Sequence, residues 1–103
     1  MAEKDYFLIL DLNNSVRIRF RTEHGNVVGF VVQQETYVDG MYQPVVRYDS
    51  SHGRGHRDIL DRSGNTINKH WLPEHMDFSA CLTYGENDIR ANWRRYLNRL
   101  LER

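Results

Sequence analysis

Alternating apolar and polar positions across residues 6–72 predict a β-sheet. In residues 15–21, three apolar side chains alternate with three arginines, which is the period of a strand with one buried face. The short apolar run at residues 6–12 fits either a first strand or a short helix, and the polar residues 1–4 are expected to be loose. Residues 27–38 are rich in β-branched and aromatic side chains and predict a long strand.

A predicted hairpin follows that strand. Asp39-Gly40 is a favoured two-residue turn because both positions tolerate positive φ, so residues 41–49 should return beside the preceding strand. Pro44 cannot donate to a ladder and indicates an open edge or a bulge. A polar loop at 50–55 then leads to a second hairpin, residues 56–72, whose two strands are separated by a Gly-containing turn.

From about Asp77 the hydrophobic period changes to that of an amphipathic helix. Its apolar positions recur at spacings of three, four and seven: Phe78, Leu82, Ile89, Trp93, Tyr96, Leu97 and Leu100. Asp77 and Ser79 are candidate N-caps, and Gly85 predicts a break near residues 84–87. The predicted fold is a single α+β domain, residues 1–103, with an antiparallel meander sheet of five to six strands and one C-terminal amphipathic helix on one face.

The predicted register sorts side chains between the two sheet faces. The core face, under the helix, should carry Val16, Ile18, Phe20, Val31, Val46 and Tyr48. The opposite face should carry Arg17, Arg19, Phe30, Arg47, Asp49, His56 and Asp58. Charged residues from distant segments are therefore expected to converge on one surface, which is either a functional face or a solvated face with cross-strand ion pairs.

Composition changes this picture only slightly. Lys+Arg and Asp+Glu are both 14, so the net charge gives no argument for nucleic-acid binding. Twelve of the 14 basic residues are arginine, whose planar fork suits phosphate, although salt bridging or a GC-rich genome explains the bias equally well. The single cysteine, Cys81, fits a reducing compartment and is expected to pack as a small apolar residue. Without a leader or a long apolar run, the expected location is the cytoplasm.

The segment RYDSSHGRGHRD, residues 47–58, gathers the candidate chemistry. RNA cleavage through the 2′-hydroxyl needs a general base, a general acid and cations that stabilise the phosphorane. His56 oriented by Asp49 is the candidate base, and His52 is the candidate acid, with Tyr48 as an alternative on the core face. Arg47 completes the candidate catalytic set. The candidate RNA-binding residues are Arg17, Arg19, Phe30, Arg57 and Asp58, with Phe30 available to stack a base.

Two other interpretations account for the same segment. Asp49, His52, His56 and Asp58 offer metal ligands, but the histidines flank a glycine loop rather than sharing a helix face, so we assign no metal and no cofactor. In a purely structural interpretation, Asp49 accepts backbone N–H bonds, Gly53 and Gly55 adopt positive φ, and Arg57 pairs with Asp61.

Residues 30–64 resemble a family of small uncharacterised prokaryotic proteins whose core reads VVRYD, two residues, HG, two residues, HRD. The shared positions are Arg47, Tyr48, Asp49, His52, Gly53, His56, Arg57 and Asp58, and the helix adds an Asn-Trp-x-x-Tyr element at residues 92–96. A weaker similarity connects the chain to TumE-like toxins of toxin–antitoxin modules. It implies a ribonuclease-like toxin and an antitoxin-like partner. The chain departs from that group at its N-terminus and in having no lysine in the motif loop.

The sequence thus predicts a small RNA-interacting protein that resembles a toxin-like, metal-independent ribonuclease. The alternative is a non-enzymatic protein-interaction module that uses a sheet edge or the helix face. Because the predicted sheet ends in an open edge, near Pro44 or at the strand of residues 66–72, a homodimer is expected.

Overall fold

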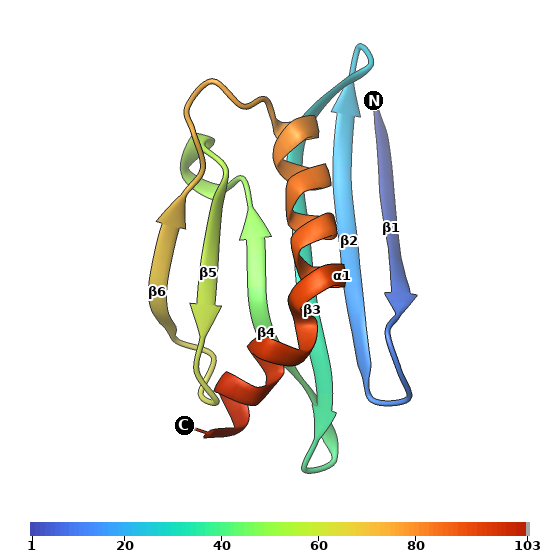
Figure 1. The fold of residues 1–103 in the computed structure, drawn as a ribbon. Coiled ribbons are helices and arrows are strands. Elements are labelled where there is room, and N and C mark those ends of the chain that lie inside the picture. The colour runs from blue at the N-terminus through green and yellow to red at the C-terminus, as the bar shows by residue number, and fades with distance from the viewer. Residues whose placement is uncertain (103) are drawn as a thin grey trace.

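The computed structural model describes residues 1–102 and consists of one sheet and one helix (Figure 1). The elements are β1 (Ala2–Ile9), β2 (Asn14–Glu23), β3 (Asn26–Val38), β4 (Met41–Asp49), the short 3₁₀ helix η1 (Ser51–Gly53), β5 (His56–Leu60), β6 (Thr66–Trp71) and α1 (Phe78–Glu102). The six strands pair antiparallel in chain order, and α1 packs on one face against β3 and β4. This confirms the predicted α+β meander with a C-terminal helix.

The N-terminal segment differs from the prediction. Strand β1 begins at Ala2 and pairs all eight of its residues with β2, so residues 2–4 are not loose and residues 6–12 do not form a helix. Residues 15–22 of β2 offer their backbone N–H and C=O groups along the whole length of β1, so the pairing includes the polar N-terminal residues.

Helix α1 is continuous, and the predicted break near Gly85 does not occur. Asp77 is the N-cap, because its Oδ1 accepts a hydrogen bond from the Ala80 backbone N–H at 2.8 Å. A Cβ at position 85 would lie 2.7 Å from Cγ of Tyr48. Gly85 therefore allows the helix to approach β4 closely, and packing compensates for its weak helix propensity.

Two β-bulges shift the register of β3. One interrupts the pairing of β2 with β3 at Arg21/Thr22, and the other interrupts β3 with β4 at Gln34/Glu35, beside Pro44 as predicted. Each bulge shifts β3 by one residue relative to its neighbouring strand. The side chains of β3 therefore lie on the face opposite to the one that the predicted register gave them. Phe30 is consequently in the core at 4% exposure, with its ring 5.9 Å from that of Phe78, whereas Val31 lies on the opposite face. The predicted positions of Phe30 and Val31 were both wrong.

The core lies between the sheet and α1. From the helix it contains Cys81, Ile89, Trp93, Tyr96 and Leu100, all buried. The burial of Cys81 confirms that it packs as a small apolar residue. Within residues 1–102, no helix combines the length and apolar character needed to cross a membrane.

Candidate functional site

The sheet face turned away from α1, which we call the outer face, gathers the charged residues. Two rows of directly paired residues cross it. The first is Arg17, Gln33, Arg47, Asp58 and Lys69, and the second is Arg19, Val31, Asp49, His56 and Trp71. Asp49 faces His56 and Arg47 faces Asp58, as the sequence predicted. Of the residues expected on this face, Phe30 alone lies on the other side.

At the centre of the outer face, His56 lies between two carboxylates. Its Nε2 is 2.9 Å from Oδ1 of Asp49 and 3.5 Å from Oδ2 of Asp58. Its Nδ1 is 3.1 Å from the backbone carbonyl oxygen of Arg54. The His56 side chain is 0% exposed, so this histidine belongs to the outer face but does not project into solvent. Lys69 Nζ lies 3.2 Å from Oδ1 of Asp58, an ion pair without the angle of a hydrogen bond.

The loop between β4 and β5 covers this cluster. Asp49 Oδ1 accepts hydrogen bonds from the backbone N–H and the hydroxyl of Ser51, at 3.0 and 2.8 Å, as the structural interpretation expected. Gly53 has positive φ, but Gly55 does not. A Cβ at position 55 would lie 2.5 Å from Sγ of Cys81. Gly55 is therefore needed for its small size, which corrects the prediction that it serves a turn.

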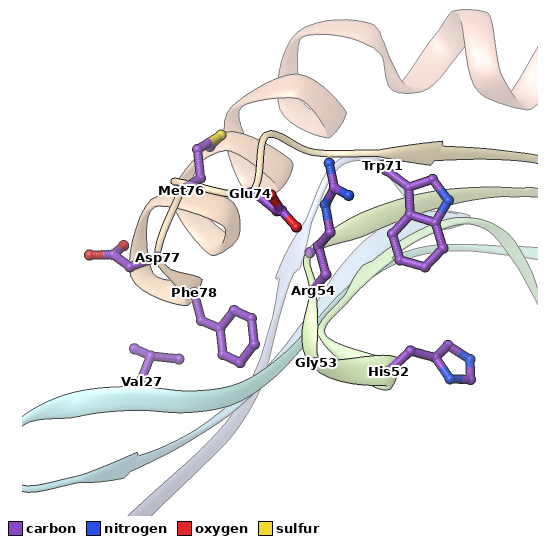
Figure 2. A pocket seen from close by; sticks show the side chains of 10 residues that line it. Val27, His52, Gly53, Arg54, Trp71, Glu74, Met76, Asp77 and Phe78 are labelled. Carbon is purple, nitrogen blue, oxygen red and sulfur yellow. The ribbon is translucent and has the colours of Figure 1, made fainter.

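Trp71 completes the cover on the β6 side. Its ring centroid lies 5.0 Å from that of His56, and the Arg54 guanidinium and Lys69 ammonium lie over its ring at 5.7 and 5.4 Å. Next to it is a cleft of about 650 Å³, bounded by the loop and the start of α1. Figure 2 shows Arg54 standing between Trp71 and Glu74, with His52 at the rim. His52 is exposed, and its ring centroid lies 6.2 Å from that of His56.

A second cleft, of about 550 Å³, opens on the other side of the cluster. Arg19, Arg21, Gly29, Asp49 and Ser51 are among its lining residues. Arg21 was not among the predicted binding residues, although its place in the alternating run of β2 was a usable signal. The Asp49 carboxylate therefore connects the buried histidine to an open, arginine-lined surface.

Two motif residues, Tyr48 and Arg57, lie on the opposite face, under α1. Arg57 Nη1 donates to the Tyr96 hydroxyl at 3.3 Å, so the predicted ion pair with Asp61 does not form. Both tyrosine hydroxyls donate to Oδ2 of Asp88, Tyr48 at 2.8 Å. Burial, with a further contribution from these hydrogen bonds, raises the pKa of Tyr48 and Tyr96 above the usual range. No sequence signal identified Asp88, because its partner Tyr48 is forty residues away.

The fold and this site define a small α+β protein with an arginine-bearing sheet face and a buried Asp–His–Asp cluster. The chain belongs to the family described as a domain of unknown function, DUF7718, which matches residues 1–103. No curated protein and no solved structure shows a significant match to the chain. The family match agrees with the resemblance to small uncharacterised proteins, and the similarity to TumE-like toxins stays a prediction.

Proposed function

We propose that this protein binds RNA through its outer face. The observation that carries the proposal is a group of four arginines on the outer face, two of which, Arg19 and Arg21, line the second cleft. The other two, Arg17 and Arg47, lie in the adjacent cross-strand row on either side of Gln33. Within residues 1–102, Arg21 and Arg47 form no ion pair, and Arg47 makes only a neutral contact, from Nε to Oε1 of Gln33 at 2.7 Å. Guanidinium groups without a carboxylate partner are suited to phosphate oxygens.

The remaining arginines of the face are partly neutralised. Arg17 and Arg19 share the carboxylate of Asp5, at 3.0 and 3.6 Å from Oδ2. Both side chains of each pair are more than two-fifths exposed, so the ion pairs are weak. Arg17 and Arg19 can therefore exchange the Asp5 carboxylate for a phosphate. Arg57 takes no part in this proposal, because it faces α1.

Single-stranded RNA also needs a surface on which bases stack. Phe30 cannot supply it, because its ring is in the core. Trp71 takes its place in the proposal: it is 42% exposed, lies in the same cross-strand row as Arg19 and Asp49, and is flanked by the cations of Arg54 and Lys69. Stacking on an indole tolerates every base, so the expected binding has little sequence preference.

The geometry supports binding better than cleavage by His56. A general base must reach the proton that it removes, within hydrogen-bond distance of the substrate. Both ring nitrogens of His56 already contact protein oxygens, and the side chain is inaccessible. His52 is exposed and remains the available acid–base group for a toxin-like ribonuclease activity.

The test is fluorescence anisotropy with a labelled single-stranded RNA of about ten nucleotides. We expect wild-type affinity to fall steeply between about 50 and 200 mM salt. The double variant Arg21→Ala/Arg47→Ala should bind more weakly and lower the salt slope by about 1.4, because each phosphate contact to a single strand contributes about 0.7. Arg99→Ala, exposed on the far side of the molecule in α1, is the matched control and should bind like wild type. The same RNA run on a denaturing gel reports cleavage.

Two results would reject the proposal. One is a wild-type protein that leaves the anisotropy unchanged at the lowest salt. The other is a double variant with the same affinity and salt slope as wild type, which would place any RNA elsewhere on the surface.

A protein-interaction module is the second candidate, and exposed apolar side chains on edge strand β1 favour it. Phe7 is 64% exposed and Ile9 is 71% exposed, and both lie beside a third cleft lined also by Leu12 and Tyr42. An apolar edge of this kind suits strand addition by a partner such as an antitoxin-like protein. Capture of a labelled neighbouring-gene product by wild type, and its loss in Phe7→Lys, would support this candidate over RNA binding.

A further inference from the structure

The hydrogen bonding of His56 determines which ring nitrogen carries a proton. A backbone carbonyl only accepts hydrogen bonds, so the 3.1 Å contact to the Arg54 carbonyl places a hydrogen on Nδ1. In the neutral ring, Nε2 then presents a lone pair. That lone pair faces Oδ1 of Asp49 and Oδ2 of Asp58, at 2.9 and 3.5 Å, and these atoms are also acceptors.

Ser51 does not relieve this arrangement. Its hydroxyl donates to Oδ1 of Asp49 at 2.8 Å. Because that hydrogen is already used, the Ser51 oxygen presents only lone pairs to Nε2 of His56, at 3.5 Å. Electron-rich atoms therefore converge on one buried point. Only a cation satisfies them there, either a proton on Nε2 or a metal ion.

We propose that Nε2 of His56, Oδ1 of Asp49 and Oδ2 of Asp58 bind a divalent transition-metal ion. The three ligand atoms lie within 4.8 Å of one another, and all three residues are buried. Metal–ligand bonds of about 2.0–2.2 Å place neighbouring ligand atoms about 3–3.5 Å apart, which is close to the two distances from Nε2. A metal-bound histidine also typically donates its other ring N–H to a carbonyl or carboxylate, as His56 does to Arg54.

The ligand types and the local charges indicate which ion fits. One imidazole with two carboxylates suits Mn²⁺ or Zn²⁺ better than Mg²⁺ or Ca²⁺, which prefer oxygen ligands alone. Two carboxylates bring two negative charges into a buried site, and Lys69 compensates for part of this at Oδ1 of Asp58, the oxygen that does not face His56. A divalent ion more than balances the one negative charge that Lys69 leaves.

The surroundings indicate where an ion would enter this site and which parts of the fold it would hold together. Trp71 closes it on the β6 side, while Asp49 and Ser51 line the second cleft and leave a path from solvent. Because its ligands come from β4 and β5, and the Arg54 carbonyl comes from the loop between them, the ion would join these three segments. Three protein ligands also leave a coordination position open toward the cleft.

The test uses chelator-treated, untagged full-length protein titrated with Mn²⁺, Zn²⁺ or Mg²⁺ in a calorimeter and in thermal melts. We expect one Mn²⁺ or Zn²⁺ per chain with a rise in melting temperature, and at least tenfold weaker Mg²⁺ binding. Asp49→Asn and Asp58→Asn should each lose at least tenfold in affinity. Asp5→Asn, on the same face, and His52→Ala, on the adjacent loop, should bind like wild type.

A second measurement does not depend on the variants folding. Paramagnetic broadening by Mn²⁺ in the amide spectrum of the wild type should centre on Asp49, His56 and Asp58. Broadening centred on exposed histidines instead, or calorimetry without stoichiometric binding, would overturn the proposal and leave Nε2 protonated in a buried ion cluster. Neither outcome affects the RNA experiment, which can be run in the presence of chelator.

Discussion

Gly85 of α1 lies so close to Tyr48 of β4 that a Cβ at position 85 would be 2.7 Å from Cγ of the tyrosine ring. The ring cannot move aside easily, because it is buried and its hydroxyl is bonded to Asp88. Overpacking in Gly85→Ala should cost about 1–3 kcal/mol, and alanine regains roughly 1 kcal/mol through its higher helix propensity. The expected net effect is a decrease of up to about 2 kcal/mol in the free energy of unfolding.

Urea denaturation measures this effect. Thr83→Ala, two residues away on the exposed side of the same helix, is the control and should change stability by less than about 0.5 kcal/mol. A Gly85→Ala protein more stable than wild type would mean that propensity dominates and that α1 has room to move from the sheet.

Trp93 is the largest side chain that α1 buries against the sheet. Its backbone carbonyl also accepts a hydrogen bond from the buried Gln34 amide at 3.0 Å. Trp93→Ala should cost about 3–5 kcal/mol, the usual range for truncating a buried aromatic residue. In thermal melts, a variant within a degree or two of wild type would place the ring outside the core, and Arg99→Ala serves as the exposed control.

The tyrosine pair bonded to Asp88 predicts sensitivity to alkaline pH. Folding raises the pKa of Tyr48 and Tyr96 above the unfolded value of about 10. Their neutral forms therefore favour the folded state, and this stability is complete below pH 10 and is lost as pH rises through the folded pKa values. In an absorbance titration, we expect fewer than the six tyrosines of the chain to ionise before circular dichroism reports unfolding. Ionisation of all six tyrosines while the protein is still folded would contradict the raised pKa of Tyr48 and Tyr96.

Two bulges that the predicted register did not include, one of them indicated by Pro44, explain which parts of the sheet could be predicted from sequence. Each shifts β3 by one residue, one relative to β2 and the other relative to β4, so the shifts cancel between those outer neighbours. The placement of Arg17 and Arg47 on one face was therefore predicted correctly. The pairing of Asp49 with His56 was also predicted correctly, because it does not involve β3. Only the faces of β3 itself were exchanged, because a bulge has no reliable sequence signal apart from a residue such as Pro44.

Burial at the site was the other feature that sequence could not provide. Strand alternation places His56 on the outer face, but its burial depends on the η1 loop and on Trp71, which come from other segments. Removing His56 should therefore affect the fold as well as any activity, contrary to the expectation from an exposed position. Similarly, Arg57 reaches α1 because the ladder pairs it with Tyr48 on the inner face.

The homodimer remains a prediction. Of the two edges expected from the sequence, residues 66–71 do form edge strand β6, whereas Pro44 lies in the interior strand β4. The other edge is β1, and it is the more apolar candidate for pairing. This edge strand exposes Phe7 and Ile9, and unpaired backbone groups next to apolar side chains invite strand pairing. Light scattering at micromolar concentration should give about twice the 12.3 kDa chain mass, and Phe7→Lys should return it to the monomer value. A wild-type mass of one chain would reject the dimer.

The approach of Gly55 to Cys81 predicts an energetic coupling between the loop and α1. A Cβ at position 55 would lie 2.5 Å from Sγ and 3.2 Å from Cβ of Cys81, so Gly55→Ala should lower stability by about 1–3 kcal/mol. Removing the sulfur in Cys81→Ala leaves the farther of these two contacts. The cost of Gly55→Ala should therefore be smaller in that background, with a coupling energy of at least about 0.5 kcal/mol in a double-mutant cycle.

Gly29→Ala is the matched control, because a Cβ there meets its nearest neighbour at an ordinary 3.6 Å. Strictly additive effects of Gly55→Ala and Cys81→Ala would show that the loop yields without contacting the helix. Coupling, by contrast, would mean that α1 fixes the position of the loop. Because Arg54 precedes Gly55 and its carbonyl accepts from Nδ1 of His56, the helix would then also fix the orientation of the buried histidine.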